Sequence, residues 1–183
     1  MGLSRQMTES ESIRRVLGGD PEAFEMLVQT HYAGCLRFAR QMLGRREPAE
    51  DAVQETFLRA YRGLGSYDHR DRFRAWLFRI LINRCRTTLD QERRRRTDPR
   101  PLEELAPHQT PTARPDDVLA RTALEAALLR LDTRQREAFL LRYVEQLSYE
   151  EMAEATGVGV SALKMRVARA KEGLRREIGH DND

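Results

Sequence analysis

The chain has 183 residues, of which 40% are hydrophobic and 33% are charged, a polar balance for one compact core. Its formal charge is only +3, and all but two of its 32 basic residues are arginine. The longest uninterrupted apolar runs are about four residues, which excludes a membrane-spanning segment. The first twelve residues lack the apolar core of a secretory signal peptide, so we expect a cytoplasmic protein with no membrane insertion.

The cysteines and histidines point to no redox or metal chemistry. Cys35 and Cys85 lie in apolar helical patterns without a C-x-x-C spacing, which predicts reduced core residues. The four histidines are scattered along the chain and form no cluster with metal-ligand spacing. We therefore expect no cofactor, no metal and no catalytic residue.

Proline divides the chain in two. Five of the 7 prolines lie between residues 97 and 115, where the chain is expected to be extended and unpacked. Helical periodicity dominates on both sides and no run alternates as a strand would. The sequence thus predicts an all-α protein of two small helical domains on a Pro-rich linker. The expected parts are an N-terminal segment 1–19, a domain 20–96, a linker 97–115, a domain 116–178 and a tail 179–183.

The first half contains three predicted helices. Asp20 and Pro21 are typical of an N-cap and first helical residue, and the apolar period continues to Gly44. A second helix is expected from Pro48 to about Leu64, and a third from about Phe73. The predicted buried stripe of the second helix is Val53, Phe57, Tyr61 and Leu64, and another face carries Asp51, Gln54, Glu55, Leu58 and Arg62. Spacing alone gives that second face no role beyond solvent exposure.

The third helix opens a basic region. Residues 79–100 contain eight arginines and three acidic residues. Arg79, Asn83 and Arg86 fall opposite the apolar stripe that includes Leu77, a pattern that favours a face tracking nucleic acid over a solvated helix end. Trp76 could stack on an unpaired base, but its place on the apolar face favours core packing.

The second half repeats this helical style. A helix capped by Asp116 or Asp117 is expected to end near Leu131, and the next begins at a capping box that spans residues 132–135. Ser148-x-x-Glu151 predicts the start of a short helix that Gly157 closes. The sequence places Ser161 as the cap of a last helix that runs to about Glu177.

This last corner has the pattern of a helix-turn-helix. Leu163, Val167, Ala170 and Leu174 form one apolar stripe. Residues 161–176 carry six basic side chains and one glutamate, more than a helix dipole explains. Cationic donors beside small residues suit close approach to DNA. The candidate DNA-contacting residues are Ser161, Lys164, Met165, Arg166, Ala168 and Arg169.

An enzyme is the weakest alternative. Residues 157–162 fit G-x-G-x-x-A, a variant of the dinucleotide-binding fingerprint. That fingerprint needs a preceding strand, whereas a capped helix is predicted here. A helix-turn-helix corner explains the same residues better.

Three segments together resemble a known family. Residues 49–60 (AEDAVQETFLRA) resemble the region 2.2 helix of bacterial sigma factors. Residues 73–83, beginning FRAWLFRI, resemble regions 2.3 and 2.4 of the extracytoplasmic-function (ECF) group, and residues 147–171 resemble region 4.2. The match covers most of residues 22–178, in the family's order.

The resemblance implies partners that spacing does not. It assigns Asp51, Gln54, Glu55 and Leu58 to the clamp of the polymerase β′ subunit. It assigns Phe73, Asn83 and Arg86, with the loop 65–72, to the reading and opening of the −10 element, and the basic face described above adds Arg79. The predicted recognition helix would read the −35 element. The family also implies contact with the β flap and an anti-sigma factor as partner. The alternative is a helix-turn-helix regulator that acts without polymerase, which leaves the Asp51 face unused.

Overall fold

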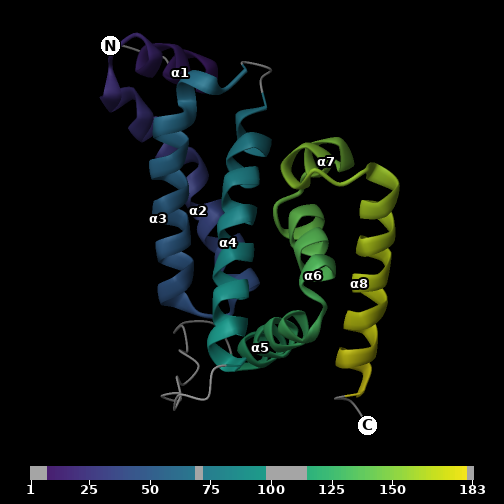
Figure 1. Cartoon of the computed structure of the whole chain (residues 1–183). Coiled ribbons are helices and arrows are strands. Elements are labelled where there is room, and N and C mark those ends of the chain that lie inside the picture. Colours follow the sequence, from purple (N-terminus) through teal and green to yellow (C-terminus); the bar gives the residue numbers. More distant parts are fainter. Residues whose placement is uncertain (1–7, 69–71, 98–114, 181–183) are drawn as a thin grey trace.

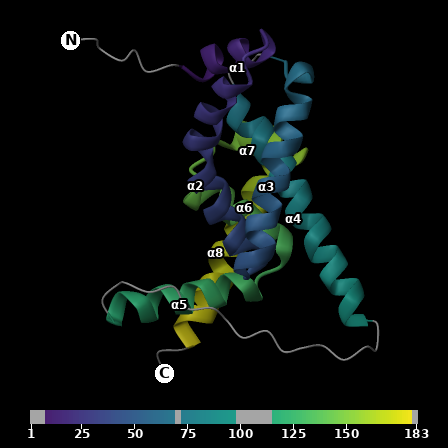
Figure 2. The ribbon, with the colours of Figure 1, turned by 90° about the vertical axis from the view of Figure 1, so that its left-hand side faces the viewer.

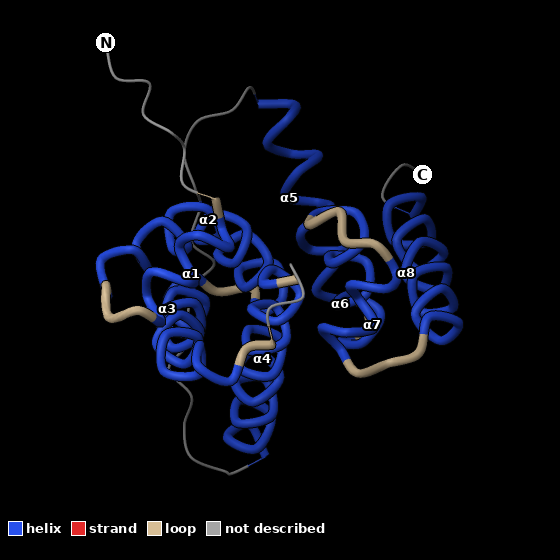
Figure 3. Tube along the Cα trace, turned by 90° about the horizontal axis from the view of Figure 1, so that it is seen from above, coloured by secondary structure: helices blue, strands red, loops and turns tan. Residues whose placement is uncertain are grey.

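The computed structural model describes residues 8–68, 72–97 and 115–180, and every regular element in them is helical (Figure 3). The α-helices are α1 (Glu9–Leu17), α2 (Phe24–Leu43), α3 (Arg46–Gly63), α4 (Phe73–Thr97), α5 (Pro115–Arg130), α6 (Thr133–Phe139), α7 (Tyr149–Thr156) and α8 (Val160–His180). Short helical turns lie at Pro21–Ala23, Leu64–Ser66 and Leu140–Val144. The all-α prediction is confirmed, and most of the predicted linker lies outside the described residues. Within the described segments, no helix is long and apolar enough to cross a bilayer.

Helices α1–α4 form the N-terminal bundle. α2, α3 and α4 run side by side, with α1 across one end (Figure 1). Their apolar faces meet in a core that includes Phe38, Leu77 and Leu81. Phe38 and Phe78 pack edge to face at 5.5 Å, which fixes α2 against α4.

Four details of this bundle differ from the prediction. The segment before residue 20 contains α1, which Thr8 caps by accepting a hydrogen bond from the amide of Glu11. Asp20 caps nothing, because Arg15 donates to its carboxylate instead. Helix α3 begins at Arg46, two residues before Pro48. Tyr61 is exposed and not part of the buried stripe, since it packs only edge-on against Phe24.

Helices α5–α8 form the C-terminal bundle. Asp132 caps α6 by accepting from the amides of Arg134 and Gln135. Gly157 ends α7 with a φ of 70°, a left-handed conformation that favours glycine. Helix α8 begins at Val160, so Ser161 lies inside its first turn and the predicted cap at Ser161 is wrong.

The two bundles pack against each other. α7 lies against α4, and α5, at one end of the C-terminal bundle, contacts both α8 and α2 (Figures 1 and 2). Their buried apolar residues form one continuous core cluster. At Gly44, a Cβ atom would lie 2.9 Å from Leu129 Cδ2, so glycine lets α5 approach the end of α2. The sequence predicts two bundles, but not this interface.

Candidate nucleic-acid interface

The outer face of α8 is free for contact. Ser161, Lys164, Met165, Ala168 and Arg169 are exposed, and Arg166 is half-buried. The predicted apolar stripe of this helix is buried against α6 and α7, as expected. Burial of one stripe therefore orients the basic face outward, where it can enter a DNA groove.

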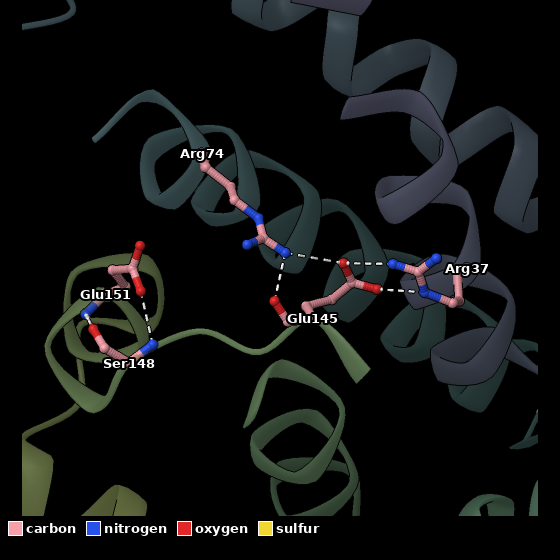
Figure 4. Close-up of polar contacts among 5 residues, drawn as sticks. All are labelled: Arg37, Arg74, Glu145, Ser148 and Glu151. Atoms are coloured by element: carbon pink, nitrogen blue, oxygen red, sulfur yellow. Dashed lines mark hydrogen bonds and ion pairs between the residues drawn. The ribbon is translucent and has the colours of Figure 1, made fainter. Parts of the chain in front are cut away.

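Capping and aromatic contacts hold this corner in place. The Ser148 hydroxyl accepts from the Glu151 amide, and the Glu151 carboxylate accepts from the Ser148 amide at 2.7 Å, which completes the predicted capping box (Figure 4). Lys164 Nζ lies 5.5 Å from the centre of the Tyr149 ring. This cation–π contact restrains Lys164, a role for Tyr149 that the spacing does not reveal.

The candidate −10 residues differ in exposure. Arg79 and Asn83 are exposed on α4. Arg86 is half-buried, because its guanidinium donates to both carboxylate oxygens of Glu137 on α6, at 2.8 and 2.7 Å. Phe73 is fully buried. In this arrangement, only Arg79 and Asn83 of the four are open to DNA.

Phe73 belongs to an aromatic cluster at the base of the loop before α4. Its ring centre lies 5.5 Å from that of His31, 5.7 Å from that of Tyr67 and 5.5 Å from that of Trp76. Tyr67 Oη accepts from the amide of Arg72 at 3.0 Å, which ties the two ends of the loop together. Residues 69–71 lie outside the described residues. The cluster fixes where the loop leaves the bundle, and core packing of Trp76, as predicted, is part of it.

The loop also meets the C-terminal bundle. Arg72 Nη1 donates to Glu154 Oε2 on α7 at 2.9 Å, and this hydrogen bond raises the pKa of Arg72. Both groups are substantially exposed, so the pair contributes little to stability. The contact shows that α7 lies beside the loop.

The acidic face of α3 is open. Asp51, Gln54 and Leu58 are exposed, and Glu55 is half-buried. Arg59 donates to Glu55 at 2.6 Å, and this hydrogen bond lowers the pKa of the carboxyl, so Glu55 stays ionised at neutral pH. Leu58 adds an exposed apolar side chain to these acidic groups. Such a mixed surface suits a protein partner.

The fingerprint at residues 157–162 has the wrong surroundings for a dinucleotide. Helix α7, and not a strand, precedes Gly157, and the part of the chain that the structure describes contains no βαβ unit. Among the described residues, no three His, Cys, Asp or Glu side chains gather where a metal ion could bind. The turn between α7 and α8 is a helix-turn-helix corner.

Comparisons with known proteins decide the family. Residues 27–95 match the family model for sigma-70 region 2, and residues 121–174 match the model for sigma-70 region 4. The chain is 33% identical to the ECF RNA polymerase sigma factor SigM of Mycobacterium tuberculosis, across 99% of this chain and 90% of SigM. The chain is a sigma factor of the ECF group. It binds core RNA polymerase, recognises −10 and −35 promoter elements and promotes DNA opening for initiation.

Other relatives agree with this assignment. This sigma factor is 29% identical to the ECF sigma factor SigW of Bacillus subtilis, across 94% of this chain and 98% of SigW. Its fold matches CnrH in complex with the cytosolic domain of CnrY, with a TM-score of 0.72 and 28% identity over 93% of this chain and 96% of that one. It also matches RpoE in complex with the anti-sigma factor NepR from Bartonella quintana, with a TM-score of 0.70 and 28% identity over 85% and 96%. The family consists of polymerase subunits without catalysis of their own.

Buried charges link the two bundles of this sigma factor. Glu137 and Glu145 of the C-terminal bundle are each only 1% exposed. Arg136, also buried, donates to the carbonyl of Met42 at the end of α2, at 2.6 Å, and burial lowers its pKa. The sequence alone does not distinguish these residues from solvated charges on a helix surface. They are buried only because a helix from a distant part of the chain packs against them.

Proposed function

We propose that this sigma factor binds its partners through the three surfaces described above. The α3 face binds polymerase, the α4 face with its loop binds the −10 element, and the α8 face binds the −35 element. The observation that carries this proposal is the outward placement of the basic α8 face over a buried stripe. Duplex DNA presents guanine edges and phosphates to such cationic side chains.

The α3 face suits the basic clamp helices of the β′ subunit. Asp51 and Glu55 supply negative charge, and Gln54 and Leu58 add polar and apolar contact. Opposite charges across an interface orient the partners and raise the association rate. The C-terminal bundle would also contact the β flap.

The −10 element would meet Arg79 and Asn83 first, since these are exposed on α4. Bases of the opened strand would be held by the loop that precedes Phe73. Phe73 then acts through the aromatic cluster that positions this loop, and not by direct contact. Arg86 becomes available only when Glu137 withdraws.

The chain would work in the cytoplasm, where core polymerase is found, and would be inhibited by a protein of the anti-sigma class. The similarity to RpoE, which is solved in complex with the anti-sigma factor NepR, supports this partner. A purified inhibitor should abolish transcription directed by this chain, and its removal should restore it.

The polymerase surface is tested by charge reversal. Asp51→Arg with Glu55→Arg should abolish co-elution with core polymerase while the circular dichroism spectrum stays that of the wild type. Glu22→Arg with Glu25→Arg, which reverses two exposed acidic residues outside this face, serves as the matched control. If the first variant still assembles with core polymerase as the wild type does, the α3 assignment is wrong.

A further inference from the structure

Three arginines of the N-terminal bundle point at the C-terminal bundle. Arg37 lies on α2, and Arg74 and Arg86 lie on α4. Arg37 Nε donates to Glu145 Oε1 at 2.9 Å, and Arg37 Nη2 donates to Glu145 Oε2 at 3.1 Å. Arg74 Nη2 donates to the Glu145 main-chain carbonyl and lies 3.3 Å from Glu145 Oε2 (Figure 4). Two guanidinium groups from different helices thus converge on one carboxylate.

The acceptors are buried, whereas the donors are half-buried or exposed. Glu145 and Glu137 are 1% exposed, whereas the side chains of Arg37, Arg74 and Arg86 are 48%, 38% and 34% exposed. Within the described residues, every carboxylate that pairs with these arginines belongs to the C-terminal bundle. The N-terminal bundle therefore carries three cationic groups whose anions come from elsewhere.

The geometry suits a phosphate as well as a carboxylate. A guanidinium presents parallel N–H donors that bind either group in a bidentate manner. A cavity of about 380 Å³ adjoins the site and is lined by Arg37, Arg74, Phe78 and Glu145. Arg74 follows Phe73 at the base of the candidate −10 loop, and Arg86 lies three residues from Asn83. Both arginines thus lie on the helix that carries the surface proposed for the −10 element, although Arg86 and Glu137 line a different cavity from Arg74 and Glu145.

The Glu145 carboxylate packs closely against Gly34 of α2. A Cβ atom at residue 34 would lie 2.9 Å from Glu145 Oε2. Glycine in the interior of α2 lowers helix propensity, so its presence there needs a packing reason. That reason is the approach of Glu145 to Arg37 across the helix.

We propose that an anion site in two parts, Arg37 with Arg74 and, further along α4, Arg86, binds the phosphodiester backbone of single-stranded promoter DNA. Glu145 occupies the first part and Glu137 the second when the bundles are closed. The proposal rests on the function proposed above and adds Arg37 and Arg74 to its DNA-binding residues. Carboxylate and phosphate compete for the same donors, so DNA binding at this site requires the bundles to separate. The outer face of α8 remains exposed in the closed arrangement, so duplex binding there does not require separation.

The test measures binding of a short, fluorescein-labelled single-stranded DNA of random sequence to the full chain by fluorescence anisotropy. Glu137→Gln with Glu145→Gln removes both competing charges and keeps the side-chain shapes. This variant should bind at least tenfold more tightly than the wild type at low salt. Its plot of log K against log salt should be steeper by about 2, because three arginines would release the counterions of about three phosphates.

A second variant opens the interface without removing charge. Gly34→Leu places a side chain against Glu145 and replaces glycine with a strong helix former, so α2 is retained. It should also bind the oligonucleotide more tightly than the wild type. Agreement between the two variants separates loss of the competing carboxylates from a nonspecific gain of positive charge.

Removal of the arginines supplies the contrary test. Arg37→Gln with Arg74→Gln, introduced into the Glu137→Gln and Glu145→Gln chain, should cancel the gain and restore a shallow salt slope. Arg14→Gln with Arg46→Gln, two exposed arginines outside the proposed binding surfaces, should leave the gain intact. Equal binding by the opened variants and the wild type, or an undiminished gain after loss of Arg37 and Arg74, would overturn the proposal.

The outcome is separable from that of the proposed function. Recruitment of core polymerase and promoter-directed transcription test the latter and depend on the α3 and α8 faces. A chain that directs transcription but whose opened variants gain no affinity for single-stranded DNA would reject the anion site alone.

Discussion

Arg86 on α4 and Glu137 on α6 form a two-point ion pair, with N–O distances of 2.8 and 2.7 Å, across the interface between the bundles. Glu137 is buried, and Arg86 is one of the residues that the family resemblance assigns to the −10 element. A group expected to contact DNA is thus engaged by the bundle that would bind the −35 element. The closed arrangement withholds Arg86 while it leaves the α8 face open.

Loss of Arg86 should therefore affect stability as well as DNA binding. Arg86→Ala leaves the buried Glu137 carboxylate without its donor, and we expect the free energy of unfolding to fall by about 2 kcal/mol. Arg79→Ala removes an exposed arginine from the same helix and should change it by less than about 0.5 kcal/mol. Urea denaturation of both variants compares their stabilities. Equal denaturation midpoints would show that the ion pair does not contribute to the free energy of unfolding.

Arg169 tests the α8 face. Arg169→Ala should weaken binding to promoter duplex. If Arg169 contacts a phosphate, the salt slope should also fall by about 1; if it contacts a base, discrimination between promoter sequences should relax instead. Binding titrations at several salt concentrations distinguish the two, with Arg14→Ala on α1 as the control. Unchanged binding at every salt concentration would remove Arg169 from the interface.

Capping at the helix-turn-helix corner gives a matched pair of serines. Ser148→Ala removes the hydroxyl that accepts from the Glu151 amide, which should lower the free energy of unfolding by about 1 kcal/mol. Ser161 lies within the first turn of α8, so Ser161→Ala should have little effect on stability. Thermal denaturation of the two variants tests this, and a larger loss at Ser161 would reverse the assignment of the cap.

The two buried thiols should be alkylated slowly in the folded chain. Burial raises the pKa of Cys35 and of Cys85 from 9.0 to about 12. A raised pKa reduces the thiolate fraction, so below pH 9 each thiol should react with iodoacetamide about a thousandfold more slowly in the folded chain than in the unfolded chain. Mass spectrometry of timed reactions at pH 8 measures this. Rapid labelling of the folded chain would contradict the buried positions of both cysteines.

The sequence predicts local features better than distant contacts. The stripe from Leu163 to Leu174 has an unbroken helical period, and the Ser148–Glu151 capping box is complete within four residues, so both were predictable. Asp20 failed as a cap because Arg15, five residues earlier, competes for its carboxylate. Local patterns are reliable where no other side chain offers a better partner.

No local sequence pattern predicts the interface between the bundles. Glu145 lies 108 residues from Arg37, and Glu137 lies 51 residues from Arg86. In the sequence each of these glutamates stands among other charged residues and has the pattern of a solvated group. Their burial follows from docking of one bundle on the other, which no periodicity within either bundle encodes. Charge and helical spacing predict the basic faces of α4 and α8, whereas the polymerase residues and the role of Phe73 depend on resemblance to the family.

Reconstituted transcription measures whether this chain directs core RNA polymerase to promoters. The purified chain, core RNA polymerase and a fragment library from the source genome are combined, and transcripts that depend on the chain are mapped. We expect defined start sites that share upstream −10 and −35 elements, and loss of these transcripts with the Asp51→Arg and Glu55→Arg chain. Specific binding to duplex DNA without any association with core polymerase would contradict it and would indicate a helix-turn-helix regulator that acts alone.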